Sequence, residues 1–145
     1  MTPKEYLLTI RYLSMRISMK KKELERLNEE IGYISGMDYS SEPVRSSPNG
    51  DTLERQIVRV ADLEAEIAED IADTARHRAK IIDEIMSLGN TDYVQILCMR
   101  YVDMLSLSDV ARKLNYSLDW VKHLHGRALY EFGKSVLKDD TKKHL

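Results

Sequence analysis

The sequence predicts an all-α protein, in which a long N-terminal antiparallel helical hairpin (a coiled coil) precedes a C-terminal helix-turn-helix domain. Charged residues make up 32% of the chain and aromatic residues only 7%, with just three prolines and six glycines. Apolar residues recur at the spacing of amphipathic helices through most of its length. We assign residues 1–89 to the hairpin, which we expect to mediate oligomerisation, and residues 90–145 to the helix-turn-helix domain.

Length and composition limit the possible functions. The 145 residues allow one or two small domains. No run of 18 apolar residues occurs, so we expect no membrane partner, and the N-terminus lacks the pattern of a signal peptide. The single cysteine, Cys98, cannot form an internal disulfide, which suits a reducing compartment. We therefore expect a cytoplasmic protein.

The first predicted helix begins at Thr2-Pro3, a capping residue followed by proline, and ends near Gly36. Its apolar residues hold a heptad seam that only Lys20 interrupts, as in a coiled coil. The seam residues are Tyr6, Ile10, Leu13, Ile17, Leu24, Leu27, Ile31 and Ile34. Residues 37–50 follow, with two prolines, four serines and an Asn-Gly pair. We expect a loop here, long enough to reverse the chain.

The second predicted helix runs from Asp51 to about Leu88. Its seam consists of Leu53, Ile57, Val60, Ile67, Ile71, Ile81, Ile85 and Leu88. Residues 1–36 carry seven basic and five acidic groups, whereas 51–88 carry five basic and ten acidic. Antiparallel pairing would bring Lys20–Lys22 near the acidic run from Asp62 to Glu69. A strip of alanines (Ala68, Ala72, Ala75 and Ala79) and apolar residues such as Met15 stay uncovered in this arrangement. They predict a homodimer or higher homo-oligomer through the N-terminal helices.

Gly89-Asn90 ends the second helix, and a third is predicted over residues 92–102. Val94, Leu97, Cys98 and Tyr101 form its core face. Two short helices follow, capped by Ser106 and Ser117, each with an aspartate in its first turn. Asn115-Tyr116 is the whole turn between them, and Asn tolerates the left-handed conformation that a helix end usually needs. So short a connection predicts a helix-turn-helix. Its interior positions are Val110, Ala111, Leu114, Tyr116, Val121 and Leu124.

From Tyr93 to Phe132 the sequence resembles the C-terminal helix-turn-helix domain, region 4, of bacterial sigma-70-type factors. The matching features are Leu97, Arg100 and Tyr101, then Leu105-Ser106, Val110-Ala111, Leu114 and Ser117, then Val121-Lys122 and His125-x-Arg127-Ala128-Leu129. With its long helical N-terminal half, the whole chain resembles phage and prophage late transcriptional regulators of the RinA/ArpU type. The resemblance implies double-stranded DNA as partner and a bacterial host cell as location. It also allows contact with RNA polymerase.

A helix-turn-helix reads DNA by placing its second helix in the major groove. Here that helix begins at Ser117, and Leu118, Asp119, Lys122 and His123 are the outward positions of its first turns. We predict DNA binding by Ser106, Ser117, Leu118, Asp119, Lys122, His123 and Arg127, with Lys122 and Arg127 the main phosphate or base contacts. We expect Trp120 to pack into the core. Residues 90–145 hold nine Lys/Arg against seven Asp/Glu, so one copy should hold DNA poorly.

Two other classes of function stay open. A DNA-packaging component similar to a terminase small subunit also combines a helix-turn-helix with coiled coils, although its reader usually comes first. A protein-interaction module would bind RNA polymerase or a sigma factor without touching DNA. We expect no enzyme, cofactor or metal site, since no catalytic spacing of side chains or phosphate loop occurs. His123 and His125 point about 200° apart on a helix and cannot share a metal.

Overall fold

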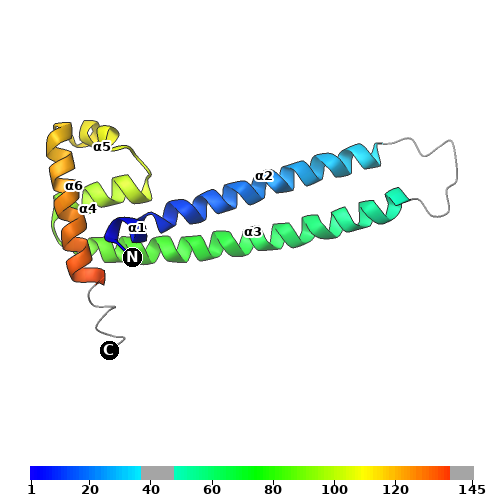
Figure 1. Ribbon diagram of the computed structural model, residues 1–145, viewed down its shortest axis with the longest axis horizontal. Coiled ribbons are helices and arrows are strands. Elements are labelled where there is room, and N and C mark those ends of the chain that lie inside the picture. The colour runs from blue at the N-terminus through cyan, green and yellow to red at the C-terminus, as the bar shows by residue number, and fades with distance from the viewer. Residues whose placement is uncertain (37–47, 138–145) are drawn as a thin grey trace, which may run out of the picture. The chain divides into compact units, whose positions relative to one another are not determined.

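The computed structural model describes residues 1–36 and 48–137, and every regular element in this part of the chain is a helix (Figure 1). In chain order they are α1 (Pro3–Leu7), α2 (Thr9–Ser35), α3 (Pro48–Met86), α4 (Thr91–Leu97), η1 (Cys98–Val102), α5 (Leu107–Leu114), α6 (Leu118–Phe132) and η2 (Gly133–Leu137), where η denotes a π-helical turn. The predicted all-α fold is confirmed. Of the predicted loop, residues 37–47 lie outside the described residues, and residues 48–50 already belong to α3.

The predicted first helix is interrupted once, at Leu8, between α1 and α2. The expected cap is present: the Thr2 hydroxyl accepts from the backbone N–H of Glu5 at 3.1 Å, and the Glu5 carboxylate accepts from the Thr2 N–H. The Thr9 hydroxyl donates to the carbonyl of Tyr6 at 2.6 Å. Such a side-chain bond to a backbone carbonyl competes with helical pairing, and it lies at the interruption.

The helices divide into two compact units, Met1–Ser14 with Thr74–Leu145, and Met15–Asp73. In the second unit, α2 and α3 run antiparallel, as predicted. The Lys20 ammonium bonds Asp70 at 2.5 Å and lies 3.6 Å from Glu66, while farther along α2 the Glu30 carboxylate accepts from the Gln56 amide at 3.3 Å. In these contacts the residue number on α3 falls as the residue number on α2 rises, which defines an antiparallel helical hairpin.

Most of the predicted α3 seam is confirmed, since Ile67, Ile81 and Ile85 are buried and Leu53, Val60 and Leu88 are half-buried, but two of its members face outward. Ile57 and Ile71, which were assigned to the seam, are 51% and 45% exposed. The positions that meet α2 are the preceding ones, since Gln56 and Asp70 pair across the hairpin. One residue corresponds to 100° around a helix. At Ile71 the reason is the charge of Lys20, because an ammonium group on the seam needs the Asp70 carboxylate opposite it more than an isoleucine.

The first unit contains two hydrophobic clusters of buried side chains. One joins α1 and the ends of α2 and α3 to α4, η1 and α6; its members are Leu7, Ile10, Ile81, Ile85, Leu97, Tyr101, Ala128 and Phe132. The other lies inside the helix-turn-helix and consists of Ile96, Val110, Ala111, Val121 and Leu124. Two polar pairs, Tyr6 with Glu84 and Thr9 with His77, lie beside the first cluster. The helix-turn-helix therefore shares a core with residues 1–14 and 74–89, and the boundary at residues 89 and 90 stays a prediction.

Along the described helices, no stretch combines the length and the apolar character that crossing a bilayer requires.

The turn between α5 and α6 generates a first prediction. Asn115 adopts the expected left-handed conformation, with φ of 58° and ψ of 41°. A β-branched side chain is strained there, so Asn115→Val should lower the free energy of unfolding by about 1–2 kcal/mol. Asn115→Gly should leave it nearly unchanged, because glycine adopts this conformation freely. Urea unfolding followed by circular dichroism measures both, and equal losses in the two variants would contradict this account of the turn.

A second prediction concerns pH. The hydrogen bond from Lys20 holds the pKa of the Asp70 carboxyl below its ordinary value. Such a group stabilises the fold above its unfolded-state pKa of about 3.9, and this contribution is lost as pH falls through the lower, folded-state pKa. We expect the thermal unfolding midpoint to drop with acidification in this range, and to drop less in Asp70→Asn. Glu25→Gln, an exposed carboxylate on α2, is the control and should behave like the native protein.

Candidate nucleic-acid interface

The helix-turn-helix is built by local capping and a small apolar core. The Ser106 hydroxyl accepts from the N–H of Asp109 at 3.1 Å and starts α5, and the Ser117 hydroxyl accepts from the N–H of Trp120 at 3.2 Å and starts α6. Val110 on α5 and Val121 on α6 are fully buried in the core between the helices. Both caps and the interior positions Val110, Ala111, Val121 and Leu124 agree with the sequence analysis.

Tyr116 does not lie in the interior, contrary to the prediction. Its side chain is exposed, and its hydroxyl donates to the Asp92 carboxylate on α4 at 2.8 Å. This bond to a carboxylate raises the pKa of Tyr116. Because the core positions of both helices are already filled, the phenol crosses the outside of the turn and connects it to α4.

The outward face of α6 carries the predicted DNA-binding residues. Asp119, Lys122, His123 and Arg127 are exposed, and Leu118 is 37% exposed. Val121, Leu124 and Ala128 occupy the opposite, buried face of the same helix. The structure thus brings these five side chains onto the first three turns of α6. Ser106 and Ser117 lie at the starts of α5 and α6, where both are exposed. The role of these residues in DNA binding stays a prediction.

Trp120 belongs to this exposed face, and the expectation that it packs into the core was wrong. It is 47% exposed, and its ring stacks on His123 with centroids 5.4 Å apart and planes 21° from parallel. The neighbouring Val121, which was also expected in the interior, is fully buried. The signal in the sequence was the spacing of three between Trp120 and His123, which places both rings on one side of a helix.

The charge on this surface is mixed. Lys122 and Arg127 on α6, with Lys113 on α5, offer exposed cations. Arg112 instead bonds Asp109 within α5. The Ser106 hydroxyl, and then Arg112, hold the pKa of the Asp109 carboxyl below its usual range, so Asp109 stays ionised. Asp119 lies in the first turn of α6, where a negative charge suits the helix dipole. The surface can donate hydrogen bonds to an anion but is not strongly basic.

Two partly buried polar contacts support the helix-turn-helix on the side opposite the exposed face of α6. Arg100 donates to the carbonyl of Leu105 at 3.1 Å, and its guanidinium lies 5.7 Å from the centroid of the Tyr101 ring. The Tyr101 hydroxyl and His125 Nε2 share a hydrogen bond of 2.7 Å. Burial lowers the pKa of His125, so the imidazole is held in its neutral form. Arg100 and Tyr101 are among the residues that resemble sigma-70 region 4, but their pattern in the sequence did not predict this supporting role.

Chemistry other than binding finds no support in the described residues. His125 turns inward to Tyr101 while His123 faces outward, and none of the His, Cys, Asp and Glu groups in the described ranges could hold a metal ion. Cys98 is half-buried, and burial raises the pKa of its thiol. This is the environment of a packed cysteine rather than of a nucleophile.

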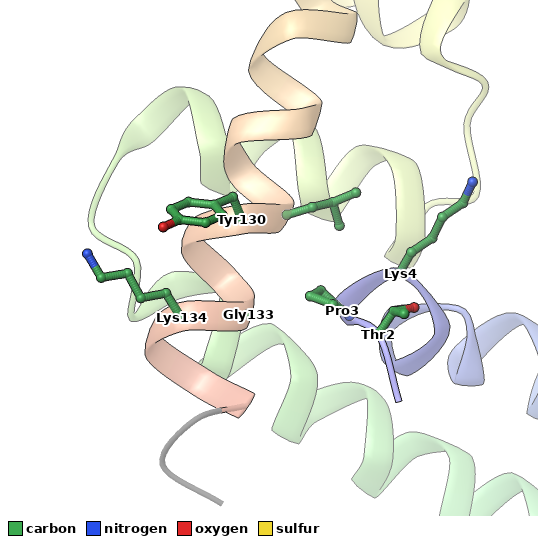
Figure 2. A pocket seen from close by; sticks show the side chains of 7 residues that line it. Thr2, Pro3, Lys4, Tyr130, Gly133 and Lys134 are labelled. Atoms are coloured by element: carbon green, nitrogen blue, oxygen red, sulfur yellow. The ribbon is translucent and has the colours of Figure 1, made fainter. Parts of the chain in front are cut away.

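A hollow of about 500 Å³ lies between α1 and the end of α6 (Figure 2). Thr2, Pro3, Lys4, Leu129, Tyr130, Gly133 and Lys134 line it. Figure 2 shows Pro3 directed at Gly133, and a Cβ on Gly133 would lie 2.7 Å from the Pro3 ring. Because Gly133 has no side chain, α1 can pack closely against the end of α6, and the N-terminus is thereby held against the helix-turn-helix.

Comparison with known proteins gives one match. Residues 94–131 match the family model for Sigma-70, region 4, and this segment runs from α4 through most of α6. The segment is therefore a sigma-70 region 4-like helix-turn-helix, which indicates a DNA-binding regulatory function. No curated protein matched the chain, and no solved structure did so.

The position of Trp120 yields a third prediction. Because Trp120 is 47% exposed and stacks on the exposed His123, Trp120→Ala should cost well below the roughly 3–5 kcal/mol expected for truncating a buried aromatic residue. Phe132→Ala, which removes a fully buried ring, should show a loss of that larger size. Chemical unfolding compares the two variants, and a loss for Trp120→Ala as large as for Phe132→Ala would mean that Trp120 is in the core after all.

Proposed function

We propose that this protein is a sequence-specific transcriptional regulator that binds double-stranded DNA, with α6 as the reading helix. The observation that carries the proposal is a coincidence of position. The segment that matches sigma-70 region 4 contains the helix whose exposed face presents Lys122, His123 and Arg127. The role is one of binding, without catalysis or cofactor.

The side chains divide into three kinds of contact. Lys122 and Arg127 donate to phosphate oxygens or to guanine O6 and N7. Leu118 offers a methyl contact to thymine, and Asp119 can accept from the N4 amino group of cytosine. Trp120, stacked on His123, presents an apolar edge beside these polar groups. Leu118 and Asp119 occupy positions where sigma-type domains would be expected to carry an arginine-rich surface. We therefore expect the target sequence to differ from that of sigma factors.

The wider setting is also part of the proposal. A region 4-like domain acts where DNA meets RNA polymerase, so polymerase is the second partner that we propose, in the cytoplasm of a bacterial host. The order of parts, a long helical hairpin before the reader, supports an origin in a phage or prophage of the RinA/ArpU type. Genes for phage structural proteins beside this one would test that origin.

The fourth prediction tests DNA binding itself. Purified protein should enrich one sequence from random duplex DNA and shift it in a gel, with an affinity that falls as salt rises. Lys122→Ala and Arg127→Ala should each weaken the complex, by about 1–3 kcal/mol where the side chain contacts a base. Where the contact is to phosphate, the salt dependence should instead become shallower by one charge.

Lys21→Ala is the matched control, because it removes an exposed lysine from the hairpin and leaves α6 unchanged. It should bind as the native protein does. A protein that enriches no duplex sequence and shows no salt-dependent shift would overturn the proposal. A role in protein contact alone would then take its place.

A further inference from the structure

The exposed side of α3 carries a second, complete apolar seam. Six exposed alanines recur with alternating spacings of four and three: Ala61, Ala65, Ala68, Ala72, Ala75 and Ala79. Val58 continues the pattern before them, and Ile82 and Met86 continue it after them. Val58 is 59% exposed and Met86 60%, while Ile57 and Ile71 flank the seam at 51% and 45%.

Nothing in the chain described here covers this face. α2 packs on the side of α3 that carries Ile67 and Asp70, and α3 continues as one helix from Pro48 to Met86. From Val58 to Met86 the seam extends about 42 Å without a charged residue. So long an apolar face indicates an interaction surface, and alanines allow helix axes to approach at the short end of the usual range.

We propose that this face binds a second copy of the chain, with the two α3 helices antiparallel and the twofold axis near Asp70. In this arrangement Ala68 packs against the partner's Ala72, Ala61 against the partner's Ala79, and Val58 against the partner's Ile82. From Val58 to Ile82 every layer of the seam is then filled from both sides by apolar side chains, while Met86 at each end lies opposite the partner's Glu54. The interface has the self-complementary form of a closed dimer.

The charges beside the seam fix this orientation. Residues that flank a coiled-coil seam pair across the interface and set its direction and register. In the antiparallel arrangement Glu64 lies opposite Arg78 of the partner subunit, and Arg55 opposite Asp83 of the partner subunit. Asp62 lies opposite the partner's Arg76 in the same register. The twofold axis repeats each of these three pairs, which gives six attractive contacts. Glu69 meets the partner's Glu69 at the axis, the one like-charged contact of this register among these flanking residues.

Other arrangements of the same seam bring like charges together. A parallel pair places Glu64 against the partner's Glu69. An antiparallel pair shifted by one heptad places Arg55 against the partner's Arg76 and Asp62 against the partner's Glu69. The opposite shift places Asp62 against the partner's Asp83. The centred antiparallel arrangement is therefore the one that the charge pattern favours.

The experiment measures the mass of the full chain in solution without DNA, so its result is independent of the DNA-binding proposal. Light scattering at micromolar concentration should give twice the 16.8 kDa of one chain. Ala72→Glu, which places a charge in the middle of the seam, should give a single chain. Ser18→Glu, which adds the same charge on an exposed part of α2, should leave the dimer intact. Circular dichroism confirms that each variant is folded.

A charge swap tests the register even if Ala72→Glu fails to fold. Glu64→Arg alone places two arginines opposite each other, and Arg78→Glu alone places two glutamates opposite each other. Each should raise the dimer dissociation constant at least tenfold. An equimolar mixture of the two variants should form a heterodimer, because both of its Glu–Arg contacts are attractive. A native protein of single-chain mass, or a dimer that these substitutions leave unchanged, would overturn the proposal.

Discussion

The ion pair between Lys20 and Asp70 determines how the hairpin is put together. Lys20 occupies a seam position on α2 where every other heptad offers an apolar residue, so α3 must present a carboxylate there. The ammonium group bonds Asp70 and lies near Glu66, and these two acidic residues are one helical turn apart on the same side of α3. A pair of this kind adds little to stability when it is partly exposed. Its effect is on the geometry of the pairing, since it holds the Asp70 side of α3 toward α2.

The same rotation decides which surface the hairpin leaves uncovered. Turning Asp70 toward α2 turns Ile71, Ala68 and Ala72 away from it. The alanine seam is therefore exposed because the side of α3 that carries Leu53, Val60, Ile67 and Asp70 faces α2. The packing of the hairpin thus sets which face of α3 the second copy in the proposed dimer would meet.

Local signals made much of the fold and the site predictable. Thr2, Ser106 and Ser117 cap the helices where the sequence places them, since a cap bonds a backbone group only three residues away. The left-handed backbone conformation of Asn115 was predictable because asparagine tolerates it better than most residues do. The errors fall where a side chain depends on a distant partner. Ile71 was misplaced because Asp70 pairs with Lys20 on α2, and Ile57 because Gln56 pairs with Glu30. Tyr116 was misplaced because its partner, Asp92, lies on another helix. Trp120 was expected in the core, which Val121 and Leu124 fill from the same helix.

The modest charge of the helix-turn-helix would give the dimer that we propose a physical purpose in DNA binding. Affinity for DNA grows with the number of phosphates that a protein neutralises. The helix-turn-helix has few exposed cations for this, among them Lys113, Lys122 and Arg127, and Asp119 on α6 opposes them. Adding positive charge would raise affinity for every sequence equally. Joining two readers raises it only where two sites lie at the right separation, because the second binding event becomes intramolecular. In the proposed dimer, the weakly basic helix-turn-helix and the self-complementary α3 would therefore act together. Selectivity would come from the separation of the two DNA sites as well as from base contacts.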